Sequence, residues 1–386
     1  MRILIVSDIT GYMRGGVPVE TRHLLDGLTA RGHVVGLVSD IPLPGMKSAF
    51  HYSIAVPIDA RLAEVLQSAI VSFKPDVVHV MAMSSRGIIR IGPILKGRPW
   101  ILTTHSLPPG ETKLNAFHSN ETLHYGFRAL RFLANGLAWR WLMSRGAIPR
   151  VIVHSRHMQE QTARYGYPLE RIALIALGCA AAAAPRAPRS RAEMGDAPRV
   201  VTVGGIAHTK GLHDAIAALQ TLRAHYPKIQ YRIIGEMRDA TYLAFLQSLV
   251  ERLSLHAHVS IEQGVSEAGK VAALQAADLY VQPSHEEGFC LSYIEAASVV
   301  PRLVGTDTGA IAAISEGDPG ARVVPVRRPE LIAIEAGKLL DTDLPEDLGS
   351  RRQERLNRTF GWPQYLAAHE LVYADLIGSA SASGRT

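Results

Sequence analysis

The chain has 386 residues, of which 47% are hydrophobic and 20% are charged, and its net charge is +6. This length suits two domains of ordinary size, and the composition excludes a disordered protein. No apolar run reaches the roughly 18 residues that a membrane-spanning helix needs. Residues 1–8 read as a β-strand and lack a signal-peptide layout. The two cysteines, Cys179 and Cys290, make no disulfide framework and predict free thiols in a reducing cytoplasm.

The first part of the chain alternates short apolar runs with amphipathic stretches. Strands are expected at 2–7, 33–38, 54–56, 76–80, 100–103 and 151–153. Helices are expected at 17–30, 60–72, 85–95, 117–143 and 156–165. Such alternation is typical of a parallel, doubly wound sheet. Strand one is followed by glycines that do not give the Gly-x-Gly-x-x-Gly spacing, and no Walker sequence is present. A dinucleotide-dependent dehydrogenase and a P-loop enzyme are therefore disfavoured.

The alternation restarts after a stretch rich in alanine and proline at 180–189, which predicts a linker. Further strands are expected at 199–203, 230–234, 259–261, 279–282, 302–304 and 322–324. Further helices are expected at 212–225, 240–253, 266–276, 291–298, 329–340 and 346–359. The sequence thus predicts two Rossmann-like α/β domains, at 1–178 and 198–359, joined by a linker at 179–197.

The stretch at 284–296, Ser-His-Glu-Glu-Gly-Phe-Cys-Leu-Ser-Tyr-Ile-Glu-Ala, carries two acids eight positions apart around a Gly-Phe turn. We expect Glu287 in the loop after a buried strand and Glu295 about two turns into the next helix. Backbone amides from Gly288 to Leu291 would point outward from the helix start, where an anion is favoured. Carboxylates on both sides of an anion suit the hydroxyls of a sugar and a ribose. The stretch therefore predicts a nucleotide-sugar pocket, and a capped surface helix is the alternative.

This stretch resembles the acid-x7-acid motif of the family 4 retaining glycosyltransferases. The resemblance implies that Glu287 holds hydroxyls of the donor sugar and that Glu295 holds the ribose. It also places Gly288, Phe289, Cys290 and Leu291 at the donor. The family usually has glycine where this chain has Cys290, so we expect the thiol to narrow the space around the donor phosphate.

The resemblance also predicts the GT-B fold, in which two doubly wound domains face a central cleft. The last helix of that fold crosses back to the first domain. The segment at 360–378, which begins Phe-Gly-Trp-Pro-Gln-Tyr, matches the start of such a helix.

Three further stretches match motifs of this family. Gly15 and Gly16 resemble its glycine loop, which abuts the donor phosphate and the acceptor; a simple strand-to-helix turn is the alternative. His105, in Thr-Thr-His-Ser after an expected strand, matches a histidine that contacts the donor sugar near the reacting carbon. The stretch at 203–211 resembles a Gly-Arg-(four residues)-Lys-Gly loop that clasps the diphosphate. Lys210 matches its lysine, but Gly205 stands where the family has arginine.

With glycine in place of arginine at position 205, one cation fewer stabilises the leaving diphosphate. This stabilisation is the main electrostatic demand of the reaction. Two arginines elsewhere, Arg14 and Arg156, are candidates to replace it. Otherwise catalysis would be impaired.

The resemblance implies a retaining transfer of a sugar from a nucleoside diphosphate to an acceptor hydroxyl, in synthesis of a glycan, a glycolipid or a cell-surface polysaccharide. His105, Lys210 and Glu287 would be the catalytic residues, and neither a cofactor nor a metal is expected. The alternative is a catalytically impaired GT-B protein that binds a nucleotide sugar. An epimerase of the same fold is disfavoured, because no set of carboxylates and histidines for proton abstraction is recognisable.

A basic and aromatic region lies at 106–150, with six Lys and Arg residues against two Glu residues. Such a helix can lie on an anionic membrane surface, which would bring a cytoplasmic enzyme to a lipid-linked acceptor at the inner face of the membrane. An ordinary amphipathic helix with a solvated face is the alternative. Nucleic-acid binding is not expected, because no recognised nucleic-acid module accompanies the charge.

Overall fold

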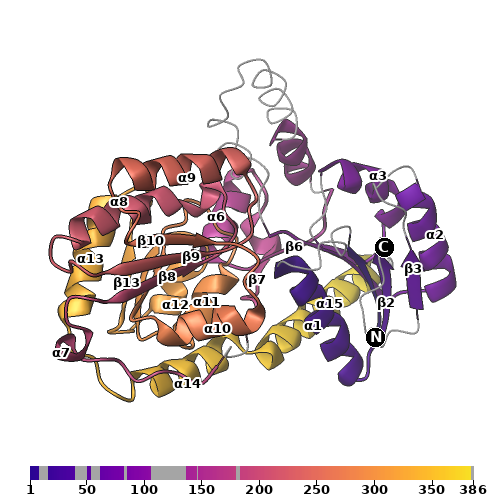
Figure 1. Cartoon of the computed structure of the whole chain (residues 1–386). Coiled ribbons are helices and arrows are strands. Elements are labelled where there is room, and N and C mark those ends of the chain that lie inside the picture. The colour runs from indigo at the N-terminus through magenta and orange to yellow at the C-terminus, as the bar shows by residue number, and fades with distance from the viewer. Residues whose placement is uncertain are drawn as a thin grey trace. The chain divides into compact units, whose positions relative to one another are not determined.

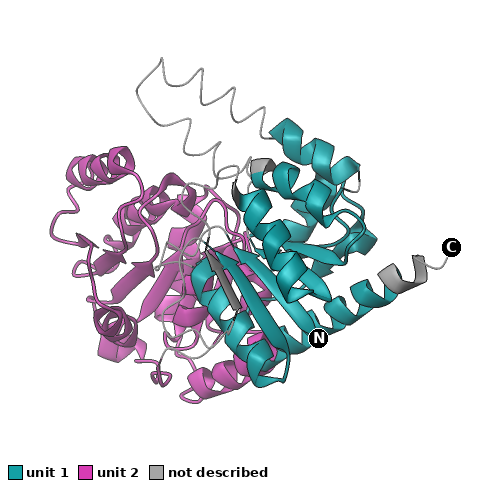
Figure 2. Cartoon of the chain, turned by 90° about the vertical axis from the view of Figure 1, so that its right-hand side faces the viewer, with its two compact units in different colours: residues 1–109, 131–178, 362–386 teal, residues 110–130, 179–361 magenta. Residues whose placement is uncertain are grey.

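The computed structural model describes residues 1–7, 16–39, 50–53, 61–81, 85–105, 136–145, 147–179 and 183–383. They fall into two compact units (Figure 2). Unit 1 takes the described residues of Met1–Pro109, Arg131–Gly178 and Trp362–Thr386, and unit 2 takes those of Cys179–Gly361. The residues that we expected to form a linker belong to unit 2. No helix in the described ranges combines the length and the apolar character needed to cross a membrane.

Unit 1 contains a parallel sheet whose strands are joined in the order β3-β2-β1-β4-β5-β6-β7. The strands are β1 (Arg2–Ser7), β2 (Val34–Ser39), β3 (Phe50–Ser53), β4 (Val77–Met81), β5 (Trp100–Thr103), β6 (Val151–Val153) and β7 (Ile172–Leu174). The strand expected at 54–56 lies outside the described residues, and β7 was not expected. The chain reverses its direction of winding between β1 and β4, which makes that edge the switch point where α/β sheets bind ligands.

Helices cover both faces of this sheet (Figure 1). They are α1 (Gly16–Ala30), α2 (Arg61–Phe73), α3 (Ser85–Leu95), α6 (Arg156–Arg164) and α15 (Trp362–Ser383), with a further helical run at 136–144. Alternate strand residues such as Leu4 and Val6 join a core with α2, α3 and the 136–144 helix. The opposite face meets α1 and α15, because His79 of β4 contacts Tyr373 of α15 there.

Unit 2 contains a second parallel sheet, in the order β10-β9-β8-β11-β12-β13. The strands are β8 (Arg199–Val203), β9 (Gln230–Ile234), β10 (Val259–Glu262), β11 (Leu279–Gln282), β12 (Arg302–Thr306) and β13 (Ala321–Val324). Each of these strands falls within about two residues of the range expected from the sequence. The switch point of this sheet lies between β8 and β11, so the loops after these two strands meet at its carboxyl edge.

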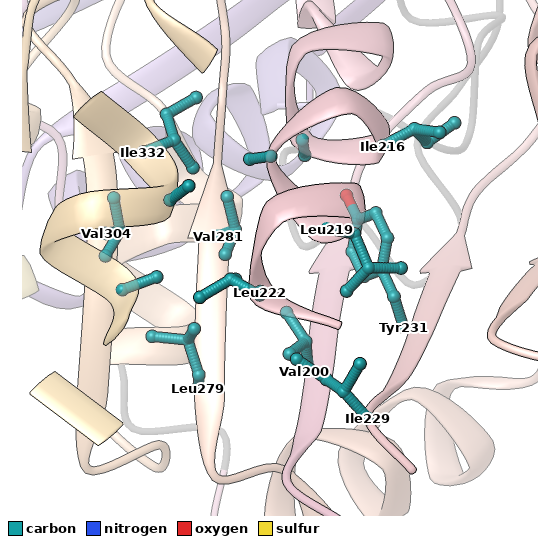
Figure 3. Close-up of a cluster of buried hydrophobic side chains, with 14 of the residues drawn as sticks. Val200, Ile216, Leu219, Leu222, Ile229, Tyr231, Leu279, Val281, Val304 and Ile332 are labelled. Atoms are coloured by element: carbon teal, nitrogen blue, oxygen red, sulfur yellow. The ribbon is translucent and has the colours of Figure 1, made fainter. Parts of the chain in front are cut away.

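Helices follow nearly every strand of unit 2 (Figure 1). They are α7 (Arg191–Met194), α8 (Leu212–Leu222), α9 (Ala240–Arg252), α10 (Glu267–Ala276), α11 (Leu291–Ala297), α12 (Ile311–Ser315), α13 (Pro329–Asp341) and α14 (Leu348–Phe360). The close-up in Figure 3 shows the core in which Leu219 and Leu222 of α8 pack with Val281 of β11, Val304 of β12 and Ile332 of α13. This core fixes β8 and β11 beneath the loops that follow them.

Within the described ranges, the chain passes between the units after Gly178 and after Gly361, and a close contact lies beside these crossings in each unit. Within unit 2, the amide of Cys179 donates to the carbonyl of Phe360 at 2.6 Å. Within unit 1, Trp362 at the start of α15 packs so closely on Gly178 that a Cβ there would lie 2.2 Å from the indole. The same indole stacks on His23 of α1, with ring centroids 3.9 Å apart. The expected closing helix is thus present, and it belongs to unit 1.

Candidate functional site

The loops that follow β8 and β11 meet at the carboxyl edge of the unit 2 sheet. Lys210 ends a short 3-10 turn, His208–Lys210, and its ammonium lies 2.7 Å from Oε1 of Glu287. The amide of His285 donates to the carbonyl of Thr209 at 2.8 Å. Gly211 has a φ of +57°, and a Cβ there would lie 2.1 Å from the carbonyl oxygen of Pro283. The two backbones therefore touch, and this contact places Lys210 beside Glu287.

Glu287 is held at one of its two carboxylate oxygens. Its side chain is 8% exposed, and Oε1 accepts hydrogen bonds from Lys210 and from the hydroxyl of Ser284 at 2.7 Å. The amide of Gln282 is a more distant donor to the same oxygen, at 3.5 Å. No described residue donates to Oε2. That oxygen remains available to accept a hydrogen bond from a ligand hydroxyl, while the acid keeps its charge balanced by Lys210.

The segment after Glu287 carries a residue in an unusual backbone conformation. Cys290, which precedes α11, has a φ of 85°, a region that side chains other than glycine rarely adopt. This explains in physical terms why glycine would be favoured at this position. Burial raises the pKa of the Cys290 thiol well above its usual value, so the thiol stays protonated. Its effect on a donor phosphate remains a prediction.

The other predicted donor residues flank Cys290. Gly288 and Phe289 form the turn, and Leu291 begins α11. Phe289 is buried and meets Phe360 edge to face, with ring centroids 5.9 Å apart. The turn is also braced by Gly309, where a Cβ would lie 2.8 Å from the carbonyl oxygen of Phe289.

Glu295 lies closer to the helix start than expected. Because α11 begins at Leu291, Glu295 is about one turn into the helix instead of two. Its carboxylate lies 3.3 Å from the ammonium of Lys270 on α10, and its side chain is 31% exposed. Lys270 also pairs with Glu267 at 2.7 Å. Glu295 is thus a partly exposed acid at the end of a small charge network.

Gly205 lies beside a cation that the sequence did not indicate. A Cβ at Gly205 would lie 3.0 Å from Cγ of Arg238, in the loop between β9 and α9. Two other arginines were candidates to replace the missing cation. Arg14 lies outside the described residues, and Arg156 belongs to unit 1, whereas Gly205 belongs to unit 2.

In unit 1, the half-buried His105 contacts a group of buried polar side chains. Its Nε2 contacts Oε2 of Glu20 on α1, and the other oxygen of Glu20 accepts a hydrogen bond from the hydroxyl of Tyr365 at 2.5 Å. Nε2 of His154 lies 3.2 Å from the same Oε1 atom. Sequence reasoning missed Glu20, His154 and Tyr365, because they come from three distant parts of the chain. Gly16 begins α1 in this unit, and Gly15 lies outside the described residues.

The protonation of this group follows from its contacts. Nδ1 of His154 faces the carbonyl of Ile175 at 2.8 Å and must carry a proton. Nε2 lies 3.2 Å from the carboxylate of Glu20, whose charge favours the protonated ring. Burial alone would raise the pKa of Glu20, but His154 and His105 outweigh it and hold that pKa well below its usual value. For His154, burial alone would lower the pKa, but the charge of Glu20 outweighs burial and raises it. The contacts of Glu20 with His154 and Tyr365 therefore hold the carboxylate that His105 contacts.

Two groups in the described ranges have metal-ligating atoms within 4.8 Å of one another: Glu20, His105 and His154 in unit 1, and His213, Asp214 and His285 in unit 2. In both, histidines already contact the carboxylate, as His285 does with Asp214 at 2.7 Å. Hydrogen bonding thus satisfies both carboxylates without an ion. The absence of a metal requirement remains a prediction.

Comparison with known families covers nearly the whole chain. The family model described as Glycosyltransferase Family 4 matches residues 14–182, and the model described as Glycosyl transferases group 1 matches residues 185–355. A glycogen synthase of Mycobacterium tuberculosis is 27% identical over 401 residues, which cover 97% of this chain and 94% of that protein. A phosphatidyl-myo-inositol mannosyltransferase of the same species is 22% identical, covering 99% of this chain and 98% of that protein.

Solved structures show the same fold. Sucrose-phosphate synthase from Thermosynechococcus elongatus has a TM-score of 0.72 at 18% identity, covering 98% of this chain and 100% of that one. HepE of Anabaena, solved with UDP and glucose, has a TM-score of 0.70 at 15% identity, covering 97% of this chain and 100% of that one. At such identities the likeness establishes the architecture, and the chemistry must be argued from this chain's own residues.

Proposed function

Because this chain belongs to the family 4 glycosyltransferases of the GT-B fold, we propose that it moves a sugar from a nucleoside-diphosphate donor to an acceptor hydroxyl with retention at the anomeric carbon. One observation carries this proposal. The Lys210–Glu287 pair lies at the switch point of the unit 2 sheet, with one carboxylate oxygen held and the other available. A cation for phosphate and an acceptor for sugar hydroxyls are thereby adjacent on a rigid edge.

The reaction would divide its work among a few groups. Lys210 would stabilise the negative charge that grows on the leaving phosphate as its bond to the anomeric carbon breaks. Glu287 would orient the sugar through Oε2, and Glu295 would hold the ribose. The acceptor oxygen would form the new bond on the same face of the sugar, and its proton would pass to the leaving phosphate. The resemblance gives His105 a contact with the donor sugar, and Glu20 would fix the orientation of its ring.

The acceptor belongs to the same proposal. The similar proteins named above act in glycogen synthesis and on a phosphatidylinositol lipid, according to their names. We propose a glycan or glycolipid acceptor for this chain, with reversible attachment to the inner face of the membrane. The helix at 136–144 supports this, because Leu137 and Trp141 lie one turn apart and are 67% and 49% exposed. Arg140, which precedes Trp141, and Arg145, which follows the helix, are also exposed, so this segment offers both apolar and cationic contacts.

A panel of nucleotide sugars, tested for thermal stabilisation, identifies the donor, because a ligand of the native state raises the melting temperature. The donor so found is then incubated with candidate acceptors, and the anomeric configuration of the product is read by NMR. Retention with release of nucleoside diphosphate is expected. A failure of every nucleotide sugar to stabilise the protein would refute the proposal, and an inverted product would refute the retaining mechanism.

A second candidate is a protein that binds a nucleotide sugar without turning it over. Gly205 favours it, since this position supplies no cation to a leaving diphosphate. The two candidates differ in one measurement: the binding protein is stabilised by the donor but releases no nucleoside diphosphate with any acceptor.

A further inference from the structure

The loop between β9 and α9 is bound to the loop that carries Gly205 and Lys210. The amide of Ile206 donates to the carbonyl of Glu236 at 2.9 Å, and the amide of Arg238 donates to the carbonyl of Ile206 at 3.1 Å. At Gly235 a Cβ would lie 1.7 Å from the carbonyl oxygen of Gly204, so the two backbones are in contact. These contacts fix the position of Arg238 relative to the loop after β8.

Arg238 occupies the space that a side chain at Gly205 would need. Its Cγ lies 3.0 Å and its Nε 3.6 Å from the position of a Cβ on Gly205. The side chain is exposed, and both loops leave the carboxyl ends of neighbouring strands. A guanidinium is therefore present at the edge of the sheet that carries the Lys210–Glu287 pair.

A diphosphate bound at this edge of the sheet would need a cation besides Lys210. The ammonium of Lys210 is already paired with the carboxylate of Glu287, so the pair together carries no net charge. A diphosphate brings at least two negative charges and accepts several hydrogen bonds. Arginine suits such a ligand well, because its planar fork can bond two phosphate oxygens at once.

We propose that Arg238 binds the diphosphate of the donor and that the absence of a side chain at Gly205 makes room for it. This inference rests on the proposed function, and it names the second cation of the same site. It also gives Gly205 a role: an arginine at 205 and an arginine at 238 would compete for one space.

The test compares R238A, G205R and the double variant G205R/R238A with the wild type, using UDP, GDP and ADP and the corresponding nucleosides in calorimetric titrations. R252A is the matched control, because Arg252 is an exposed arginine at the far end of α9, about 20 Å along the helix. Melting temperatures confirm that each variant is folded.

R238A is expected to weaken binding of the preferred nucleoside diphosphate at least about tenfold, with the nucleoside unaffected. R252A should bind as the wild type does, and G205R/R238A should regain most of the affinity that R238A loses. Equal affinity of R238A and wild type for the diphosphate would overturn the inference alone. A wild type that binds no nucleoside diphosphate would overturn the proposed function and this inference with it.

Discussion

The ammonium of Lys210 and the carboxylate of Glu287 lie 2.7 Å apart, although 77 positions separate them in the chain. They meet because β8 and β11 are neighbours in the sheet while being distant in sequence. The winding of the sheet thus brings together the cation that we propose for the phosphate and the acid that we propose for the sugar, and the two can be tested separately.

The two acids of the motif should respond differently to substitution. Glu287→Gln is expected to lower turnover while nucleoside diphosphate binding persists, and Glu295→Gln to weaken nucleotide binding itself. Each lost hydrogen bond to a charged group is worth about 1.5–3 kcal/mol. Glu267→Gln is the matched control for Glu295, because both acids pair with Lys270. Wild-type kinetics and affinity in both variants would contradict the assignment.

Lys210→Ala should cost at least about 3 kcal/mol of transition-state stabilisation, on the scale of losing one oxyanion donor. The control is Lys228→Ala, because Lys228 is an exposed lysine that pairs with Asp196 on the surface of the same unit. The comparison uses kcat/KM for the donor identified by the screen. A loss below tenfold for Lys210→Ala would remove this residue from the site.

Glu20→Gln should destabilise unit 1 by about 3–5 kcal/mol, because it leaves His154 buried without its counter-ion. All four tryptophans of the chain belong to unit 1, so their fluorescence in urea follows the unfolding of that unit. Glu370→Gln is the control: its partners Arg31 and His33 are partly exposed, and the expected loss is below about 1 kcal/mol. An equal loss of unfolding free energy in the two variants would show that the buried pair contributes no more to stability than the partly exposed one.

His369 should make unit 1 less stable in acid. Burial lowers its pKa from 6.5 to about 4, so below pH 6.5 the unfolded chain binds a proton that the folded chain does not. A histidine with a lowered folded pKa therefore costs stability as the pH falls, by about 2 kcal/mol between pH 7 and pH 5. His369→Phe should reduce the loss of unfolding free energy over this range by that amount. An unchanged pH dependence in the variant would contradict the prediction.

The basic and aromatic region at 106–150, of which the residues before 136 lie outside the described ranges, should bind anionic vesicles at low salt and leave them at high salt. The reason is that each cation near such a surface contributes about 1 kcal/mol. Sedimentation with neutral and with anionic vesicles, at two salt concentrations, tests this. Trp141→Ala should weaken the attachment, and the fluorescence of the remaining tryptophans, which include the buried Trp100, identifies unfolded material. Equal recovery in the supernatant under all four conditions would leave an ordinary amphipathic helix.

The sequence predicted the strands of unit 2 well because each is an apolar run bounded by turn residues. It missed β7 and α12, because these elements are only three and five residues long, too short for a periodic pattern. Glu287 and Lys210 could be found because each lies in a motif with fixed spacing. Glu20, His154 and Arg238 could not, because their roles depend on contacts between distant segments. The positive φ of Cys290 was also hidden, since only glycine would have signalled it.

The hydrogen bond between Cys179 and Phe360 joins the two ends of a long segment, and this has a consequence for how the protein can evolve by recombination. The described part of unit 2 runs in one stretch between these two residues, and its two ends are hydrogen-bonded, so one exchange with two adjacent junctions would replace that stretch. Unit 1 is not continuous in sequence, because α15 follows unit 2 in the chain. Trp362 of α15 must still pack on Gly178 and stack on His23. A single recombination event would therefore exchange the described part of unit 2, whereas unit 1, which carries His105, would have to change residue by residue.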